Sequence, residues 1–351
     1  MNIQELLAET ARLDASDLHI IAGFPPTLRV SGKLQPVERA VKLKPEETEP
    51  FLLPICTLEQ KEMLLANKEA DFSFNSPVGR FRVNLYYQKG SLAGAFRLIS
   101  AQIRSIEQLG LPQTLYEFTK LRQGLVLLTG PTGEGKSTTL ASMIQYINQI
   151  RALHIITIED PIEYVYPLGL SLISQREMHG DTHSWAVALR SVLREDPDVV
   201  LVGEMRDFET IAAALTIAET GHLVFATLHT NSASQTIDRV VDVFPETQQQ
   251  QIRLQLANTL EGVVSQRLVP AIAGGRVAVC EIMTGIPAVR SLIREGKTNQ
   301  LDNVILTSSE YSMVTMEMSL AKAVLDGRIS IDVATSYAVR PDDLSKMIKR
   351  L

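Results

Sequence analysis

The sequence has very little cysteine and no long apolar run. Its 351 residues include only Cys56 and Cys280, too far apart to form a zinc-ligand cluster. Two lone cysteines fit a reducing compartment, where they serve as small buried side chains. No apolar stretch approaches the roughly 20 residues of a membrane-spanning helix, and residues 1–5 lack the features of a signal peptide. We expect a cytoplasmic protein that reaches a membrane only by docking onto another protein.

The chain also lacks an excess of positive charge. Its net charge is −6, and residues 1–100 carry 12 basic and 12 acidic side chains, against 22 and 28 in the remainder. Nucleic-acid-binding domains are usually strongly basic, so the composition argues against such a partner, although a local basic patch is compatible with it. Apolar and charged residues make up 45% and 21%, which is ordinary for globular proteins and excludes a disordered or fibrous chain.

The chain is long for a single core, and its pattern predicts two domains. Residues 1–99 mix short strands with helical segments and predict a small α+β domain. Residues 100–112 have no clear periodicity and predict a linker. From 113 to 351, strands and helices alternate, which is typical of an α/β domain with a parallel sheet covered by helices. After Thr236 the pattern indicates mainly helices, with Gly274 and Gly275 at a hairpin-like turn.

The individual elements follow from periodicity. In the first domain, helical spacing covers residues 2–13 and 46–67, the latter broken near Pro54. Strands are predicted at residues 18–21, 27–30, 79–88 and 91–98. In the second domain, short apolar runs typical of strands buried on both faces occur at residues 125–129, 155–158, 199–202 and 223–227.

Residues 130–137 read GPTGEGKS and fit the phosphate-binding pattern G-x-x-x-x-G-K-[ST]. The pattern follows a predicted strand and leads into a predicted helix, so backbone N–H groups can gather around an anion. Lys136 is expected to reach the β- and γ-phosphates and Ser137 to ligate Mg²⁺. A dinucleotide pattern is not completed here, so we predict a nucleoside triphosphate. The predicted binding residues are Gly130, Pro131, Thr132, Gly133, Glu134, Gly135, Lys136, Ser137 and Thr138.

Two groups of acids follow apolar strands of the predicted sheet. Residues 159–163 come after the strand at 155–158, and Glu204 comes after the strand at 199–202. Ligands of such sheets bind beyond the carboxyl ends of the strands. We expect Glu204 to support Mg²⁺, directly or through water, with Gly203 where an aspartate is usual. Glu163 is expected to position the attacking water. The alternative is that these acids cap neighbouring helices.

His222 and His229 bracket the apolar strand at 223–227. A lone histidine is more often a structural residue than a catalytic one. Since this strand is expected to lie beside the nucleotide-binding strands, the pair favours a role in sensing the γ-phosphate.

Together these segments resemble the type II/type IV secretion ATPase superfamily and, within it, the PilT family of type IV pilus retraction ATPases. The resemblance covers nearly the whole chain. The matching segments, in the family's order, are the Walker A box at 130–137, the Asp box at 158–163, the Walker B box at 198–207 and the His box at 222–229. An N-terminal signature also matches, at Ser16, Asp17, Leu18, His19, Pro25, Pro26 and Arg29.

The resemblance implies a PAS-like N-terminal domain, a RecA-like ATPase domain and a homohexamer that hydrolyses ATP with Mg²⁺. It implies that Arg82 and Arg97 complete the ATP site. An arginine supplied to the γ-phosphate raises the rate of P-loop enzymes by about 10³–10⁵, although both residues also read as solvated strand arginines. The implied partner is the platform protein of the pilus in the inner membrane, with a paralogous retraction ATPase as a further partner. The implied location is cytoplasmic and peripheral to that membrane.

One position and one segment depart from the family pattern. Glu134 stands where the family more often has serine, and it is expected to face away from the phosphates. The retraction-associated segment at 288–295 keeps its spacing but carries Val289 and Ser291 as changes. This segment is expected to couple the nucleotide state to a partner, and an ordinary amphipathic helix is the alternative.

Four other functions compete with pilus retraction. An accessory retraction paralogue is the nearest. Extension and type II secretion ATPases usually carry a tetracysteine zinc insertion and a longer N-terminal region, which this sequence does not show. A RecA-like DNA translocase and a regulatory subunit that does not hydrolyse ATP are the other two.

Overall fold

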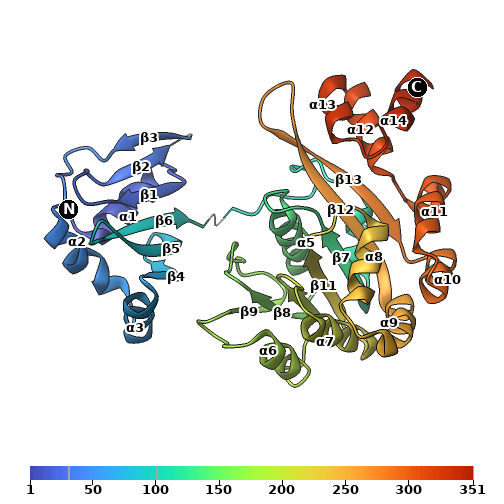
Figure 1. The fold of residues 1–351 in the computed structure, drawn as a ribbon, viewed down its shortest axis with the longest axis horizontal. Helices are drawn as coiled ribbons and strands as arrows, with labels where there is room; N and C mark the ends of the chain where they lie inside the picture. The colour runs from blue at the N-terminus through green and yellow to red at the C-terminus, as the bar shows by residue number, and fades with distance from the viewer. Residues whose placement is uncertain (31, 100–101, 351) are drawn as a thin grey trace. The chain divides into compact units, whose positions relative to one another are not determined.

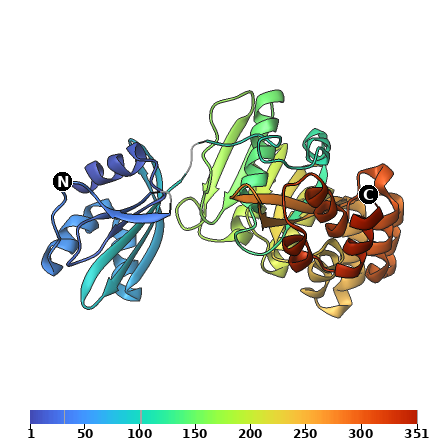
Figure 2. The ribbon, with the colours of Figure 1, turned by 90° about the horizontal axis from the view of Figure 1, so that it is seen from above.

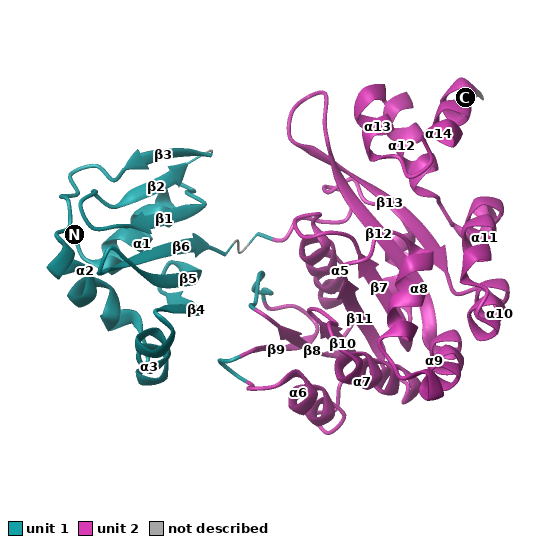
Figure 3. Cartoon of the chain, viewed as in Figure 1, with its two compact units in different colours: residues 1–102, 161–167, 179–181 teal, residues 103–160, 168–178, 182–351 magenta. Residues whose placement is uncertain are grey.

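The computed structural model describes residues 1–30, 32–99 and 102–350 (Figures 1 and 2). Its contacts divide the chain into two compact units (Figure 3). The first contains residues 1–102, 161–167 and 179–181, and the second contains the rest. In the described part of residues 99–113 there is no helix or strand, and residues 100 and 101 of the predicted linker lie outside the described residues. The limits 1–99, 100–112 and 113–351 stay predictions.

The first unit is built on a six-stranded sheet with the order β3-β2-β1-β6-β5-β4, and every neighbouring pair is antiparallel. Its elements are α1 (Ile3–Arg12), β1 (Asp17–Ile20), β2 (Thr27–Val30), β3 (Lys33–Pro36), α2 (Pro45–Leu52), η1 (Leu53–Ile55), α3 (Leu58–Asn67), β4 (Glu69–Ser76), β5 (Gly79–Gln88) and β6 (Ser91–Leu98). The predicted α+β class is confirmed, as is the helix break near Pro54. The finer PAS-like assignment remains a prediction from the resemblance.

Alternation along the strands explains which elements the sequence reveals. In β5, Phe81, Val83 and Leu85 are buried between more exposed neighbours, which is the period of a half-covered strand. Strand β3 is exposed along its whole length and gives no such signal. In β4, Ala70, Phe72 and Phe74 alternate with polar residues, and this strand was missed although the signal was present.

The second unit is built on a seven-stranded sheet with the order β13-β12-β7-β11-β10-β8-β9. All neighbouring strands are parallel except β13, which runs antiparallel to β12 at one edge. Its elements are α4 (Thr114–Lys120), β7 (Gly124–Thr129), α5 (Lys136–Ile150), β8 (His154–Glu159), β9 (Leu172–Glu177), α6 (Trp185–Val192), β10 (Val199–Val202), α7 (Phe208–Glu219), β11 (Leu223–Leu228), α8 (Ala233–Asp242), α9 (Glu246–Thr259), β12 (Leu260–Pro270), β13 (Arg276–Thr284), α10 (Pro287–Glu295), η2 (Thr298–Gln300), α11 (Leu301–Thr307), η3 (Ser309–Tyr311), α12 (Met316–Leu325), α13 (Ile331–Tyr337) and α14 (Pro341–Arg350).

Both faces of the parallel strands are covered. Leu125 and Leu127 of β7 share a core with helices α6 to α10, while the alternating residues Val126 and Leu128 are equally buried on the other face. A separate core joins β12 and β13 to α12, α13 and α14, the red helices that stand together in Figures 1 and 2. The predicted parallel sheet covered by helices is confirmed.

The prediction of mainly helical structure after Thr236 was wrong for residues 260–284. Those residues form the long hairpin β12–β13, with the predicted turn at Gly274 and Gly275. The reason is long-range pairing: β12 extends the sheet beside β7, more than 130 residues earlier in the chain. Throughout the described residues, no helix is long and apolar enough to cross a membrane.

Candidate nucleotide-binding site

The phosphate loop lies between β7 and α5. Its three glycines adopt positive φ angles, 140° at Gly130, 84° at Gly133 and 80° at Gly135, which L side chains rarely adopt. Space is a second constraint, because a Cβ atom on Gly130 would lie 2.4 Å from the carbonyl oxygen of Gln266. The loop therefore needs glycine both for its turn and for its close approach to β12.

Lys136 is the first residue of α5 and is 8% exposed. Its Nζ donates to the carbonyl oxygens of Gly130 and Pro131 at 2.7 and 2.9 Å, and lies 3.4 Å from Nδ1 of His229. The ammonium group is therefore held over the concave side of the loop. Ser137 follows in the first helical turn and is half-buried.

Glu204 and His229 meet beside this lysine. Strands β10 and β11 are adjacent and parallel, so the residues after their carboxyl ends come together. Nε2 of His229 lies 3.1 Å from Oε1 of Glu204, and the other carboxylate oxygen accepts from Arg206 at 2.8 Å. Nδ1 of the imidazole faces the Lys136 ammonium group, so Nε2 is the ring nitrogen that donates to Glu204. A continuous polar chain thus runs from Lys136 through His229 to Glu204.

Two opposing influences act on the pKa of Glu204. Partial burial raises this pKa. The hydrogen bond from Arg206 and the positive charges of His229 and Arg206 together lower it by more than burial raises it, so the net pKa of Glu204 lies below the usual value. The carboxylate is therefore ionised at neutral pH, as a group that supports a cation must be.

Gly203 has a steric explanation. A Cβ atom at this position would lie 3.1 Å from the carbonyl oxygen of Ile158 and 3.2 Å from Cα of Glu159. The end of β10 thus approaches the backbone of β8 too closely for the aspartate that is usual there, unless the backbone shifts. The carboxylate at this strand end is supplied one residue later, by Glu204.

His222 is not brought to the phosphate loop, contrary to the expectation that both histidines lie at the nucleotide. It precedes the amino end of β11, where its carbonyl accepts from Gly124 at the start of β7. Six residue pairs of the β7–β11 ladder separate it from the loop. Its Nδ1 lies 3.0 Å from the carbonyl oxygen of Ile217, so it closes the end of α7 instead.

The acids after β8 separate into two kinds. Glu159, the last residue of the strand, accepts from Thr157 and Gln175 at 2.7 and 3.2 Å. These bonds make it a structural acid. Glu163 is exposed in the stretch 161–167, which is grouped with the first unit. Its role in positioning water stays a prediction.

Arg82 and Arg97 both belong to the first unit, where they stand directly opposite one another in the β5–β6 ladder. Arg82 bonds Asp71 at 2.6 Å and Arg97 bonds Asp17 at 2.9 Å. Both guanidinium groups are largely exposed. Their contribution to an ATP site stays a prediction.

Glu134, Gln266 and Thr139 form a set of contacts that the sequence did not reveal. The carboxylate of Glu134 accepts from the backbone N–H of Leu268 in β12, so it is turned toward that strand. Gln266 donates to the carbonyl of Glu134 at 2.6 Å and accepts from the Thr139 hydroxyl at 2.7 Å. The available signal was the run of β-branched residues at 263–264, which favours a strand over the predicted helix.

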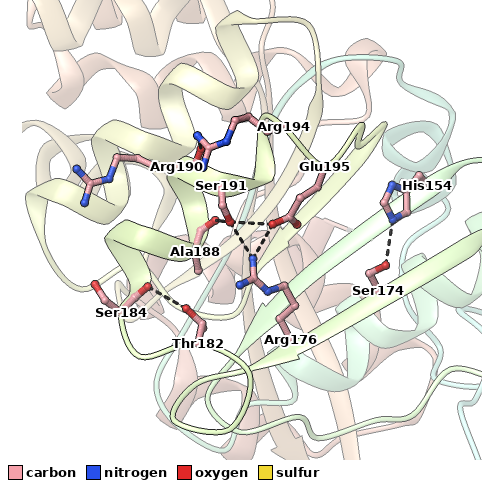
Figure 4. Close-up of polar contacts among 10 residues, drawn as sticks. All are labelled: His154, Ser174, Arg176, Thr182, Ser184, Ala188, Arg190, Ser191, Arg194 and Glu195. Atoms are coloured by element: carbon pink, nitrogen blue, oxygen red, sulfur yellow. Dashed lines mark hydrogen bonds and ion pairs between the residues drawn. The ribbon is translucent and has the colours of Figure 1, made fainter.

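A further polar cluster lies at the β9 edge of the sheet, where it joins β9 to α6 and to the residues just after that helix (Figure 4). Arg176 of β9 donates to Ser191 and Glu195 at 2.9 and 2.8 Å. His154, at the start of β8, lies 3.0 Å from the Ser174 hydroxyl. Glu195 belongs to the segment just before the Walker B box, and these contacts make it a structural residue that anchors the approach to β10.

The residues at the loop fit a nucleotide with Mg²⁺. The positive φ angles let backbone N–H groups face an anion, Lys136 supplies positive charge, and Ser137 and Glu204 supply the oxygen ligands that Mg²⁺ prefers. No cluster of three or more His, Cys, Asp or Glu residues that could hold a metal occurs in the part of the chain that is described. A cation here would therefore depend on phosphate oxygens as ligands.

Comparison with known proteins gives the family of this chain. The sequence model of the type II/IV secretion system proteins matches residues 94–274. The type IV pilus retraction ATPase PilT of Pseudomonas aeruginosa is 48% identical over 98% of this chain and 100% of that protein. The type IV pilus ATPase PilU of the same organism is 38% identical over 99% and 92%. A crystal structure of the pilus retraction motor PilT with bound ADP superposes with a TM-score of 0.92 at 46% identity, covering 99% of both chains.

These matches confirm the predicted fold class, an α/β ATPase domain preceded by a small α+β domain, and the predicted enzyme class, a P-loop ATPase. They extend over nearly the full length of this chain and of its relatives. The chain belongs to the family of type II/IV secretion system proteins, and its predicted place there beside the pilus retraction ATPases is confirmed.

Proposed function

We propose that this chain is a hexameric ATPase motor that powers the retraction of type IV pili. The observation that carries the proposal is the polar chain from Lys136 through His229 to Glu204, which joins the phosphate loop to two neighbouring strand ends. A P-loop alone indicates nucleotide binding. A linked histidine and carboxylate beside the γ-phosphate position give the site a means to respond to hydrolysis.

Each candidate residue at the phosphate loop has a role that follows from its place, while Glu163, which is grouped with the first unit, has the role expected from its position after β8. The loop N–H groups and Lys136 bind the phosphates, and Ser137 with Glu204 holds Mg²⁺, which would neutralise charge on the transferred phosphoryl group. His229 contacts both Lys136 and Glu204, so a change at the γ-phosphate reaches the ends of β10 and β11. Glu163 orients the attacking water in this proposal.

Arg82 and Arg97 complete the site in a ring. They lie on a separate unit, as arginines that arrive at a nucleotide from outside the P-loop domain do. In the proposed homohexamer, which rests on the resemblance to the retraction ATPases, these arginines would come to the nucleotide where subunits meet. The motor would work in the cytoplasm, where ATP is supplied, and act on a platform protein of the pilus in the inner membrane.

The accessory retraction ATPase is the competing function. The chain is 48% identical to PilT and 38% identical to PilU, and it contains a complete set of hydrolytic candidates. We therefore favour the retraction motor itself, with an accessory paralogue as a further partner.

Hydrolysis by the purified full chain tests the enzymatic part. Lys136→Ala is expected to abolish nucleotide binding and turnover, and Glu204→Ala to abolish turnover while ADP binding persists. Exposed Lys322→Ala in α12 is the matched control and should leave turnover unchanged. Full turnover by either site variant would refute the assignment.

A deletion strain tests the biological part. Cells that lack the chain should not twitch and should carry excess surface pili, because extension continues without retraction. Bald cells would instead favour an extension ATPase. Normal twitching that weakens only under load would favour the accessory paralogue.

A further inference from the structure

The phosphate loop is hydrogen-bonded to β12 beyond the point where β7 stops pairing with that strand. Strand β7 pairs with β12 as far as Thr129, opposite Ser265. Beyond that point β12 continues to Pro270 with only β13 beside it in the sheet, and the phosphate loop takes the place of β7. The edge of β12 between Ser265 and Pro270 is therefore available to hold the loop.

Glu134 supplies the contact. Its carboxylate accepts a hydrogen bond from the N–H of Leu268, and its own carbonyl accepts one from the Gln266 side chain at 2.6 Å. The other end of the Gln266 amide accepts from the Thr139 hydroxyl in α5 at 2.7 Å. Loop, strand and helix are thus joined by one residue of the loop and one of the strand.

The charge of Glu134 makes this contact consequential. A carboxylate inside an anion-binding loop opposes phosphate binding if it faces the phosphates. Bonded to the N–H of Leu268, it faces β12, and a hydrogen bond to a charged acceptor is roughly twice as strong as a neutral one. The same bond therefore diverts the charge and orders the loop.

The strand that holds Glu134 continues into the C-terminal part of the chain. Val269 of β12 shares a core with Val277 and Val279 of β13 and with Met316 and Leu320 of α12. A shift of the loop would reach this core along the strand, because Leu268, which bonds Glu134, is directly followed by Val269.

We propose that Glu134 is a positioning residue that pre-orders the phosphate loop for nucleoside di- and triphosphates by bonding β12. This inference rests on the proposed nucleotide-binding function, and it assigns to this chain a contact that the serine more often found there is too short to make. The negative charge strengthens the bond to Leu268 but repels the phosphates, and in this proposal the two effects offset one another, so the acceptor oxygen is the feature that favours nucleotide binding.

Two substitutions separate the acceptor from the charge. Glu134→Ala removes both, whereas Glu134→Gln keeps an acceptor oxygen and removes the charge. ADP affinity of the purified full chain is measured by calorimetry. Glu134→Ala is expected to weaken binding about 5- to 10-fold, the effect of losing one hydrogen bond to a loop, and Glu134→Gln to stay within about 2-fold of the parent. The KM for ATP should rise in Glu134→Ala while kcat changes little.

Amide hydrogen exchange gives a readout independent of activity. The Leu268 amide should exchange faster in Glu134→Ala and near the parental rate in Glu134→Gln. Glu310→Ala, an exposed glutamate of η3 with the same charge change, is the matched control and should alter neither measurement.

Tighter ADP binding by both variants would overturn the inference, because it would mean that charge repulsion dominates. Parental affinity in Glu134→Ala would also overturn it. Absence of ADP binding by the parent chain would instead refute the proposed function on which the inference rests.

Discussion

His229 and Glu204 stand 3.1 Å apart, Nε2 to Oε1, after the ends of two adjacent parallel strands. Neither residue lies in the phosphate loop, yet Nδ1 of the same imidazole is 3.4 Å from Lys136. The histidine therefore bridges the two charged groups that a nucleotide and its cation would contact. The consequence is that a change in the charge of Glu204 acts on the histidine that contacts the phosphate-loop lysine.

Arg206→Ala should move the acid limb of the pH–rate profile to higher pH. Burial raises the pKa of Glu204, and Arg206 is among the groups that lower it. Removing the guanidinium therefore raises this pKa, and the ionised carboxylate that supports the cation is lost at a higher pH as the solution is acidified. Steady-state kcat measured across pH checks this, with Arg206→Lys as the charge-conserving control. An unmoved acid limb in Arg206→Ala would contradict it.

Arg82→Ala and Arg97→Ala should each lower kcat by about 10³-fold or more while ADP binding is retained, because arginines that reach the γ-phosphate act on the transition state. Arg12→Ala provides the control, since Arg12 is an exposed arginine of the same unit, paired with Glu9 on α1. The measurement is single-turnover hydrolysis by assembled protein. Parental rates in both variants would show that these arginines are only solvated strand residues.

Arg290→Ala should destabilise the second unit by about 2–3 kcal/mol, the range for hydrogen bonds to charged groups. The guanidinium donates to the carbonyl oxygens of Gly285, Ala257 and Asn258 and bonds Glu261 at 2.7 Å. Exposed Arg294, one turn later on α10, should change stability by less than about 0.5 kcal/mol when replaced by alanine.

Urea unfolding of the two α10 variants measures the difference. The same two variants also separate structure from coupling within the segment 288–295. An Arg294→Ala protein that is stable to urea but fails in retraction would place the coupling role on the exposed face of α10. Equal destabilisation by both substitutions would contradict the assignment.

Glu281→Gln should remove a pH dependence of stability. Burial raises the pKa of Glu281 from 4.5 to about 7, aided by the charges of Asp302 and Glu317 and opposed by the hydrogen bond from the N–H of Ala233. The folded state thus keeps its proton above pH 4.5, where the unfolded state releases it. The resulting stability is fully present below pH 4.5 and is lost as the pH rises through 7.

Between these limits, the unfolding free energy of the parent should fall by roughly 1.4 kcal/mol per pH unit relative to Glu281→Gln. Chemical unfolding at pH 5, 6, 7 and 8 checks this slope. Parallel pH dependences in the two proteins would show that Glu281 titrates at its ordinary value.

Local pattern was enough for the phosphate loop and for the acid at the end of β10. A glycine-rich turn between a buried strand and a helix is specified by neighbours within about ten residues, and a carboxylate after an apolar strand is placed by the strand itself. The alternation in β5 placed that strand, whereas β3 is exposed along its whole length and gives no such signal. Strand β4 was missed although Ala70, Phe72 and Phe74 alternate with polar residues.

The remaining parts of the site depended on long-range pairing. The sequence shows His222 and His229 as equivalent ends of one strand, and only the register of β11 against β7 decides that His229 reaches Lys136 while His222 closes α7. The residues of β12 were predicted to be helical for the same reason, because β7, the strand with which they pair, lies more than 130 residues earlier in the chain.

The sequence by itself determined that residues 130–137 form a glycine-rich turn of the phosphate-binding kind and that acids follow the strands beside it, since each of those signals is local. Only the tertiary structure shows that His229, and not His222, reaches Lys136, and that Glu134 bonds Leu268. It also shows that the backbone of β8 lies too close to Gly203 for an aspartate unless the backbone shifts. His229 and Lys136 are 93 positions apart, and Glu134 and Leu268 are 134 apart. No local rule fixes such relationships: they exist only when the strands have found their order and register in the sheet.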